Sequence, residues 1–108
     1  MPVTQISASA LKTRIQNEPQ QLLLLDVREP NEFEYASIEN SVLIPLNQLP
    51  KRLTELNPQQ DIVVICHHGM RSQQACMYLA NSGFEKLSNL TGGIDAWSST
   101  CDSSVPRY

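Results

Sequence analysis

Two uninterrupted apolar runs constrain the fold of this 108-residue chain most strongly. Leu22–Leu25 continues into Asp26 and Val27, and Ile62–Ile65 continues directly into Cys66. A strand that is exposed on one face alternates apolar and polar residues, whereas a strand covered on both faces is apolar throughout, as in a parallel sheet. The second run is β-branched, which favours a strand over a helix. The sequence therefore predicts two buried strands, with Cys66 at the carboxyl end of the second.

Segments typical of helices separate these and further short strands. Strands are predicted at 3–6, 22–27, 42–44, 61–65 and 84–90. The first helix is predicted to be capped by Ser7 or Ser9 and to end near Pro19. Strands alternating with helices predict an α/β domain with a mostly parallel sheet, whose strand order the pattern does not determine. We expect one domain over residues 1–99 and an extended, loosely packed tail over 100–108.

Composition narrows the classes of function. The net charge of -3 indicates no excess of basic residues that would bind nucleic acid. No apolar run approaches the roughly 20 residues that a membrane span needs. The first residues lack the charged and apolar regions of a signal peptide, and the three cysteines form no disulfide framework. We therefore expect a protein of a reducing compartment, the cytoplasm, with neither nucleic-acid nor membrane partners.

The loop after Cys66 carries the candidate chemistry. A thiol attacks as its thiolate, and the ordinary thiol pKa of about 8.5 must be lowered for reaction near neutral pH. The helix expected to begin near Arg71 offers unpaired N–H groups and a positive dipole end, and Arg71 adds a permanent charge. Four residues separate Cys66 from Arg71, so the loop must curl, with Gly69 free to adopt a left-handed conformation. The loop is predicted to be an anion-binding nest around the sulfur.

The other polar residues of this loop have less specific roles. Two adjacent histidines, His67 and His68, rarely converge on one ion, so we expect no metal and assign them mainly backbone N–H groups. Met70 is expected at the rim of the pocket. Ser72 either donates a hydrogen bond to the sulfur or caps the helix, and the sequence does not separate these roles.

Two charged residues lie where the first buried strand ends, near the mouth of the same site. Asp26 is expected to accept backbone N–H bonds, and Arg28 to pair with a carboxylate such as Glu32. Of the remaining cysteines, Cys76 is expected in the core, and Cys101 in the tail is a weak candidate for a second reactive thiol.

The segment Cys66-His67-His68-Gly69-Met70-Arg71-Ser72 resembles the active-site loop of rhodaneses, sulfurtransferases that carry sulfur as a cysteine persulfide. The stretches 25–28 with 32–33, 44–46 and 90–97 are similar to the same family, in the same order. The resemblance implies a three-layer α/β domain with a five-stranded sheet and helices on both faces.

The resemblance also implies an activity. Cys66 would be the catalytic nucleophile, residues 67–72 would bind the substrate, and Asp26 and Arg28 would support the site. It implies a small anionic sulfur donor such as thiosulfate, or a donor or acceptor protein, with no cofactor and no metal. The physiological donor and acceptor are not in the sequence.

Two other readings belong to different functional classes. Cysteine phosphatases share the fold, but their loop is one residue longer between cysteine and arginine, and the smaller ring here suits a sulfur atom better than a phosphate. A non-catalytic module that recruits a partner is the other alternative, although such modules often lack the cysteine. The chain departs from many rhodaneses at 36–41, where a Gly-His-Ile-Pro-Gly-Ala run is replaced by Ala-Ser-Ile-Glu-Asn-Ser.

Overall fold

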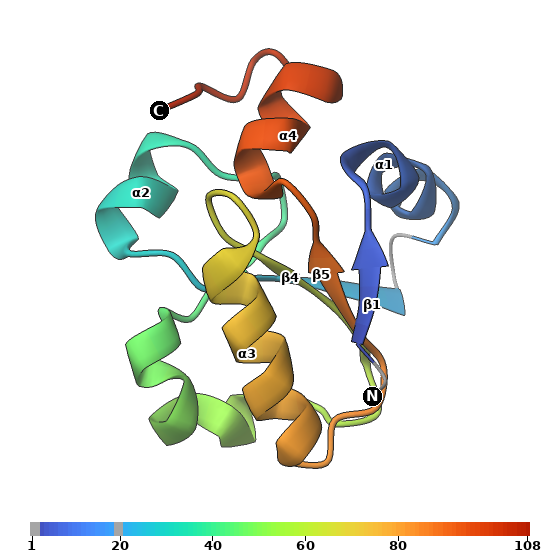
Figure 1. The fold of residues 1–108 in the computed structure, drawn as a ribbon, viewed down its shortest axis with the longest axis vertical. Coiled ribbons are helices and arrows are strands. Elements are labelled where there is room, and N and C mark those ends of the chain that lie inside the picture. Colours follow the sequence, from blue (N-terminus) through green and yellow to red (C-terminus); the bar gives the residue numbers. More distant parts are fainter. Residues whose placement is uncertain (1–2, 19–20) are drawn as a thin grey trace.

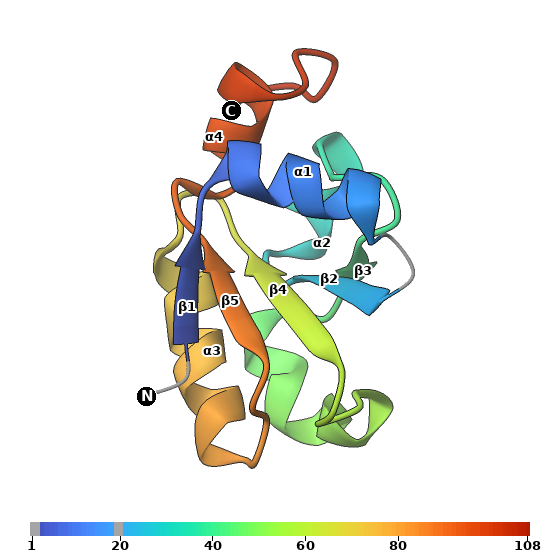
Figure 2. The same cartoon turned by 90° about the vertical axis from the view of Figure 1, so that its right-hand side faces the viewer.

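Five parallel strands form the central sheet of the computed structural model, which describes residues 3–18 and 21–108. The strand order is β1-β5-β4-β2-β3, and every neighbouring pair is parallel. The strands are β1 (Val3–Ile6), β2 (Leu22–Asp26), β3 (Val42–Leu43), β4 (Asp61–Ile65) and β5 (Leu87–Leu90). β4 therefore lies in the middle, and the carboxyl ends of all strands meet at one edge of the sheet (Figures 1 and 2).

Helices cover both faces of this sheet, so the predicted three-layer α/β fold is confirmed. They are α1 (Ala8–Asn17), α2 (Pro30–Tyr35), the 3-10 helix η2 (Leu46–Glu55), α3 (Met70–Asn81) and α4 (Gly93–Thr100). Ile62 and Val64 point into the core under α3 and η2, whereas Val63 and Ile65 point into the core under α1 and α4. All four are fully buried, which explains why this strand is apolar at every position.

Most of the expected elements occur at the expected places. Ser7 is the N-cap of α1, since its side chain accepts from the Ala10 N–H. The predicted end at Pro19 lies outside the described residues. The expected strand at 84–90 begins later, at Leu87, and the segment around Pro50 is a 3-10 helix. None of the helices in the described residues has the length and apolar character that crossing a bilayer requires.

The tail differs from the expectation that it is loosely packed. Val105 is buried in the core under α4, and Arg107 forms an ion pair with Asp95 at 2.9 Å. The ring of Tyr108 stacks on His67, with centroids 3.9 Å apart. The tail folds back toward the loop after β4 because its apolar and aromatic side chains find buried partners there.

Asp26 and Arg28 form a fully buried ion pair at the end of β2. The two side chains approach to 2.6 Å, and Asp26 also accepts the Arg28 backbone N–H at 3.0 Å, as expected. The expected pairing of Arg28 with the Glu32 carboxylate is wrong: Arg28 donates to the backbone carbonyl of Glu32 at 3.3 Å and to that of Ala36 at 2.6 Å. Since the guanidinium points inward beside Asp26, it anchors α2 through backbone carbonyls.

The start of α4 holds the loop after β4 in place. The N–H groups of Ile94 and Asp95 donate to the carbonyls of Cys66 and His67, at 2.8 and 3.2 Å. Gly93 has a φ of +59°, and a Cβ placed on it would collide with both carbonyl oxygens. The close approach of these two segments therefore requires glycine at this position.

Removal of one partner from the buried ion pair is expected to be costly. Asp26→Ala leaves the Arg28 guanidinium buried and unpaired, so we expect a loss of about 3–5 kcal/mol in the free energy of unfolding, measured by urea denaturation. The matched control is Asp61→Ala, which breaks the partly exposed pair with Arg14 and is expected to cost less than about 1 kcal/mol. Equal losses would contradict a structural role for the buried pair.

Two glycines with positive φ offer a second matched comparison. Alanine at Gly83, which has no atom within 4 Å of its added Cβ, should cost the left-handed strain alone, about 1–2 kcal/mol. Gly93→Ala adds the collision with Cys66 and His67, so we expect it to cost more than about 3 kcal/mol in the same denaturation experiment. A Gly93 variant no less stable than the Gly83 variant would show that the approach of α4 is not tight.

Candidate active site

Cys66 lies at the carboxyl end of β4, where ligands of parallel α/β sheets bind. The residue is 1% exposed and opens into a pocket of about 190 Å³. The lining residues are Cys66, His67, His68, Met70 and Arg71. At about 30 Å³ per water molecule, this volume corresponds to roughly six waters, enough for a small anion or a short thiol chain. Of the residues expected to bind substrate, the pocket gathers all but Gly69 and Ser72, which lie behind the sulfur.

One backbone N–H group of the curled loop faces the cysteine sulfur. The Gly69 N–H donates to Cys66 Sγ at 3.0 Å, and Gly69 has a φ of +107° as the N-cap of α3. The carbonyls of Cys66 and His67 point to α4, so the N–H groups of the same planar peptide units point away from α4. The first turn of α3 adds N–H groups that have no partner within the helix. The arrangement suits one negative charge at the sulfur.

A chain of buried polar side chains lies on the other side of the sulfur. Ser72 Oγ is 3.2 Å from Cys66 Sγ and donates to Asn89 Oδ1. Asn89 Nδ2 in turn donates to the Gly69 carbonyl at 3.2 Å and to Gln5 Oε1 at 3.0 Å. Asn89 was missed in the sequence, although polar residues between the two leucines of the predicted strand are a signal that could have identified it. It connects Gly69 and Ser72 to the sheet.

Arg71 forms a two-pronged ion pair with Glu32 of α2. Its two terminal nitrogens lie 2.7 and 3.0 Å from the carboxylate oxygens. This contact, more than any other, lowers the pKa of Glu32 to about 2, and it raises the pKa of Arg71. From the sequence, Arg71 was expected to await an arriving anion. Its anionic partner in the structure is a carboxylate of the same chain.

Tyr108 completes this charged cluster from the tail. Its hydroxyl donates to Glu32 Oε2 at 2.9 Å and accepts from Arg28 Nη1 at 2.7 Å. One hydroxyl thereby connects the buried pair of Arg28 with the rim pair of Arg71. Neither Glu32 nor Tyr108 was identified as a site residue from the sequence, because their approach to the loop depends on how α2 and the tail fold back.

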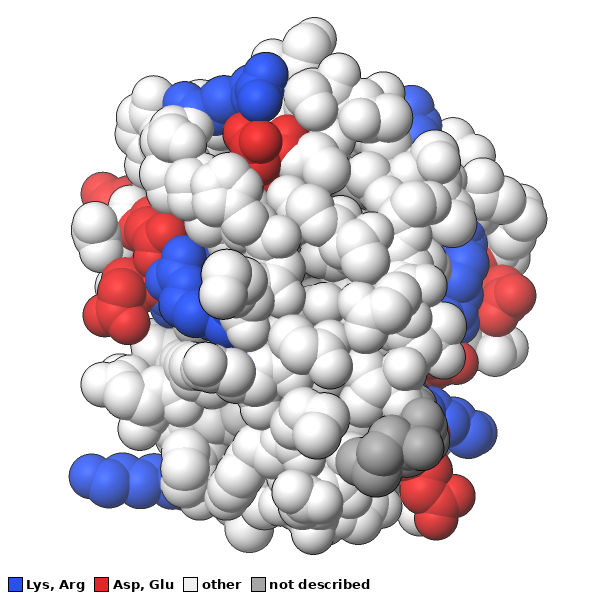
Figure 3. Space-filling view, viewed as in Figure 1, with Lys and Arg blue, Asp and Glu red and all other residues white. Residues whose placement is uncertain are grey.

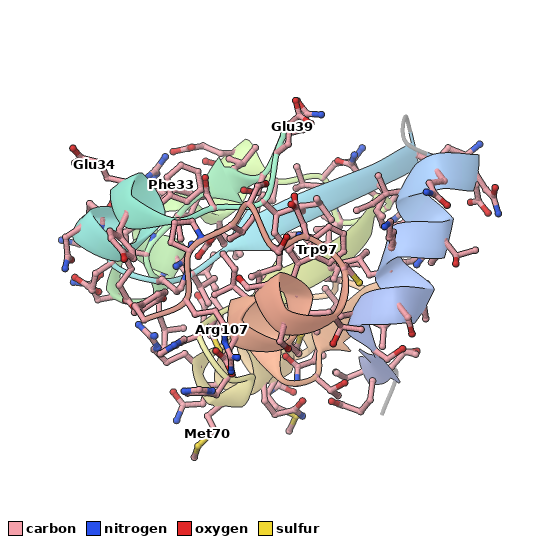
Figure 4. All side chains as sticks on the ribbon, turned by 90° about the horizontal axis from the view of Figure 1, so that it is seen from above. Phe33, Glu34, Glu39, Met70, Trp97 and Arg107 are labelled. Carbon is pink, nitrogen blue, oxygen red and sulfur yellow. The ribbon has the colours of Figure 1, made fainter. Side chains whose placement is uncertain are left out.

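The two loop histidines form an aromatic stack with Tyr108. The His67 ring lies between Tyr108 and His68, with centroid distances of 3.9 Å on both sides. In residues 3–18 and 21–108, no group of three or more His, Cys, Asp or Glu side chains is arranged to hold a metal ion. Met70 is 78% exposed and points outward from the rim of the pocket (Figure 4).

The two other cysteines lie away from the pocket lining. Cys76 is buried in α3, and this burial, more than the nearby charge of Cys66, raises the pKa of its thiol to about 12. A thiol with so high a pKa is a poor nucleophile at neutral pH. Cys101 follows α4 and packs against the core under that helix. All three cysteines are free thiols.

Comparison with known proteins agrees with this architecture. A 36%-identical relative, a sulfurtransferase of Allochromatium vinosum, matches over 88% of both chains. A rhodanese-like/PpiC domain-containing chloroplast protein of Arabidopsis thaliana is 39% identical over 99% of this chain, which spans 38% of that longer protein. The crystal structure of a rhodanese-related protein from Thermoplasma volcanium superposes with a TM-score of 0.81 at 33% identity, covering 95% of each chain.

The sequence model of the rhodanese-like domain family matches residues 7–100, which include the cysteine loop and all of the sheet except the first strand. The motifs that resemble rhodaneses in the sequence are thus part of one continuous match. The chain belongs to the rhodanese-like domain family.

Proposed function

We propose that the chain is a sulfurtransferase that moves a sulfur atom from a thiosulfate or persulfide donor to a thiophilic acceptor through a persulfide on Cys66. Relatives with the name sulfurtransferase, from Allochromatium vinosum and from Bacillus subtilis (a putative one), support the general role. The observation that carries the specific proposal is the Gly69 N–H donating to Cys66 Sγ, beside a pocket large enough for a small donor.

In the first step, the Cys66 thiolate attacks the outer sulfur of the donor. With thiosulfate, the new S–S bond forms as the old one breaks, and the electron pair of the old bond leaves with sulfite. The product is Cys66–S–S⁻, whose charge lies among the N–H groups of the loop. Preorganised donors of this kind stabilise a developing charge without rearrangement.

In the second step, a thiol or cyanide takes the outer sulfur and releases the Cys66 thiolate. His67, His68 and Gly69 contribute backbone N–H groups, and Met70 shapes the rim where an acceptor approaches. Ser72 holds the inner sulfur from behind, and Asp26 and Arg28 position α2 at the mouth. Each cycle returns the free thiol, so the scheme is a two-step exchange and needs neither cofactor nor metal.

A phosphatase is less consistent with this site. Binding of a phosphate ester by a cysteine loop needs a guanidinium available for two-pronged contact, and Arg71 already makes that contact with Glu32. The loop is also one residue short of the phosphatase pattern. A silent partner-recruiting module would have no need of an N–H group aimed at the sulfur.

Sulfur loading can be measured directly by the mass of the intact protein. Incubation with thiosulfate or an alkyl persulfide should add the mass of one sulfur atom, and cyanide should remove it. Cys66→Ser should abolish the gain, because the nucleophile is lost. Cys76→Ser and Cys101→Ser serve as controls and should retain most of it. An unchanged mass with every donor would favour the non-catalytic, partner-recruiting module. A Cys101→Ser variant that gains no sulfur would show that the Cys101 thiol takes part in the reaction.

A further inference from the structure

Three arginines around the cysteine loop are engaged in ion pairs. Arg28 pairs with Asp26, Arg71 with Glu32, and Arg107 with Asp95, whose backbone N–H holds the His67 carbonyl. Figure 3 shows the face that carries the loop, where blue and red side chains lie next to each other at the edges and uncharged atoms fill the centre. An anion that enters the pocket therefore meets one arginine, Arg71, whose charge is already neutralised, and its attraction depends on backbone N–H groups.

Glu32 is the group that neutralises the rim of the pocket. Its carboxylate accepts hydrogen bonds from both terminal nitrogens of Arg71, from the Tyr108 hydroxyl and from the backbone N–H of Glu29. The side chain is 16% exposed, so water screens these contacts less than it would at the open surface. Displacement of Glu32 from Arg71 would break several charge-assisted hydrogen bonds at once.

The two classes of sulfur donor differ in charge at this position. Thiosulfate brings two negative charges, shared by its outer sulfur and its sulfonate oxygens, and the sulfonate group must lie near the rim while the outer sulfur approaches Cys66. A protonated alkyl persulfide carries no charge, and its thiol chain can lie against the apolar rim beside the exposed Met70. The Glu32 carboxylate repels the first donor and is indifferent to the second.

We propose that Glu32 is a specificity-determining residue that disfavours dianionic donors and directs this site toward alkyl persulfides. The proposal rests on the sulfur-transfer function inferred above. In the favoured reaction, the Cys66 thiolate attacks the outer sulfur of R–S–SH and the S–S bond of the donor breaks. R–S⁻ leaves with the electron pair, and the proton stays on the transferred sulfur as Cys66–S–SH. Charge and atoms balance without another reactant.

The test compares sulfur loading by two donors, thiosulfate and an alkyl persulfide with no other charged group, using the rate constant for the gain of one sulfur mass. Glu32→Gln removes the charge but keeps a side-chain acceptor for the Glu29 N–H at the start of α2. We expect thiosulfate loading to rise about tenfold or more, because Arg71 becomes available, while persulfide loading changes less than about threefold. The gain should fall with added salt and should disappear when Arg71→Ala is added.

Glu34→Gln is the matched control, since it removes the same charge from the same helix. Glu34 is exposed, and Figure 4 shows its side chain pointing away from the body of the protein. Loading by both donors should change less than about twofold, because an exposed charge is well screened. A rise equal to that of Glu32→Gln would show a general effect of net charge and would overturn the proposal.

Further outcomes are equally decisive. Thiosulfate loading that stays the same or falls in Glu32→Gln, or a rise shared equally by both donors, would refute charge selection at the rim. If Glu32→Gln does not fold, Tyr108→Phe decides: it removes one hydrogen bond that holds Glu32, and thiosulfate loading should rise about fourfold, above the change expected for Glu34→Gln. No loading by either donor would instead refute the sulfur-transfer function itself.

Discussion

The contact between α4 and the loop after β4 determines the shape of the candidate site. Two N–H groups at the start of α4 donate to the carbonyls of Cys66 and His67, and Gly93 allows the backbone of α4 to come this close to the backbone of the loop. Because a peptide unit is planar, this contact also sets the direction of the N–H groups on the opposite side. The polar chain through Ser72 and Asn89 then fixes the other end of the loop to β5. The sulfur thus lies between two supports that both come from β5 and the helix that follows it.

Backbone dipoles, rather than side-chain charges, make this site suitable for an anion. In the sulfur transfer that we propose, the N–H groups of the loop would offer partial charges at fixed positions to a single small anion, the persulfide sulfur. The arginine that the sequence places beside the cysteine adds little attraction while Glu32 holds it in a two-pronged pair. The charge balance at the rim follows from α2, which carries Glu32, and from the tail, which carries Tyr108.

Local patterns in the sequence were sufficient for the buried strands, the position of Cys66 and the curl of its loop, but not for the order of the strands in the sheet. Apolar runs report burial directly, and the glycine and the helix start lie within a few residues of the cysteine. The same reasoning predicted that the Glu32 carboxylate pairs with Arg28. This prediction is wrong because Arg71 also competes for Glu32, and Arg28 pairs with Asp26. Arg28 lies two residues after Asp26 at a buried strand end, and this burial decides the competition. The prediction of a loosely packed tail was wrong for a similar reason, since Val105 and Tyr108 contact residues that are far away in the chain.

By itself, then, the sequence determined that a cysteine stands at the end of a buried parallel strand and that a helix begins just beyond it. Hydrophobic periodicity and short-range backbone chemistry are sufficient for these features, because both act over a few residues. The tertiary structure alone decided which carboxylate neutralises Arg71, which amide supports Ser72 and where the tail returns. Those contacts join residues 17 to 80 positions apart, and their geometry depends on the packing of whole elements.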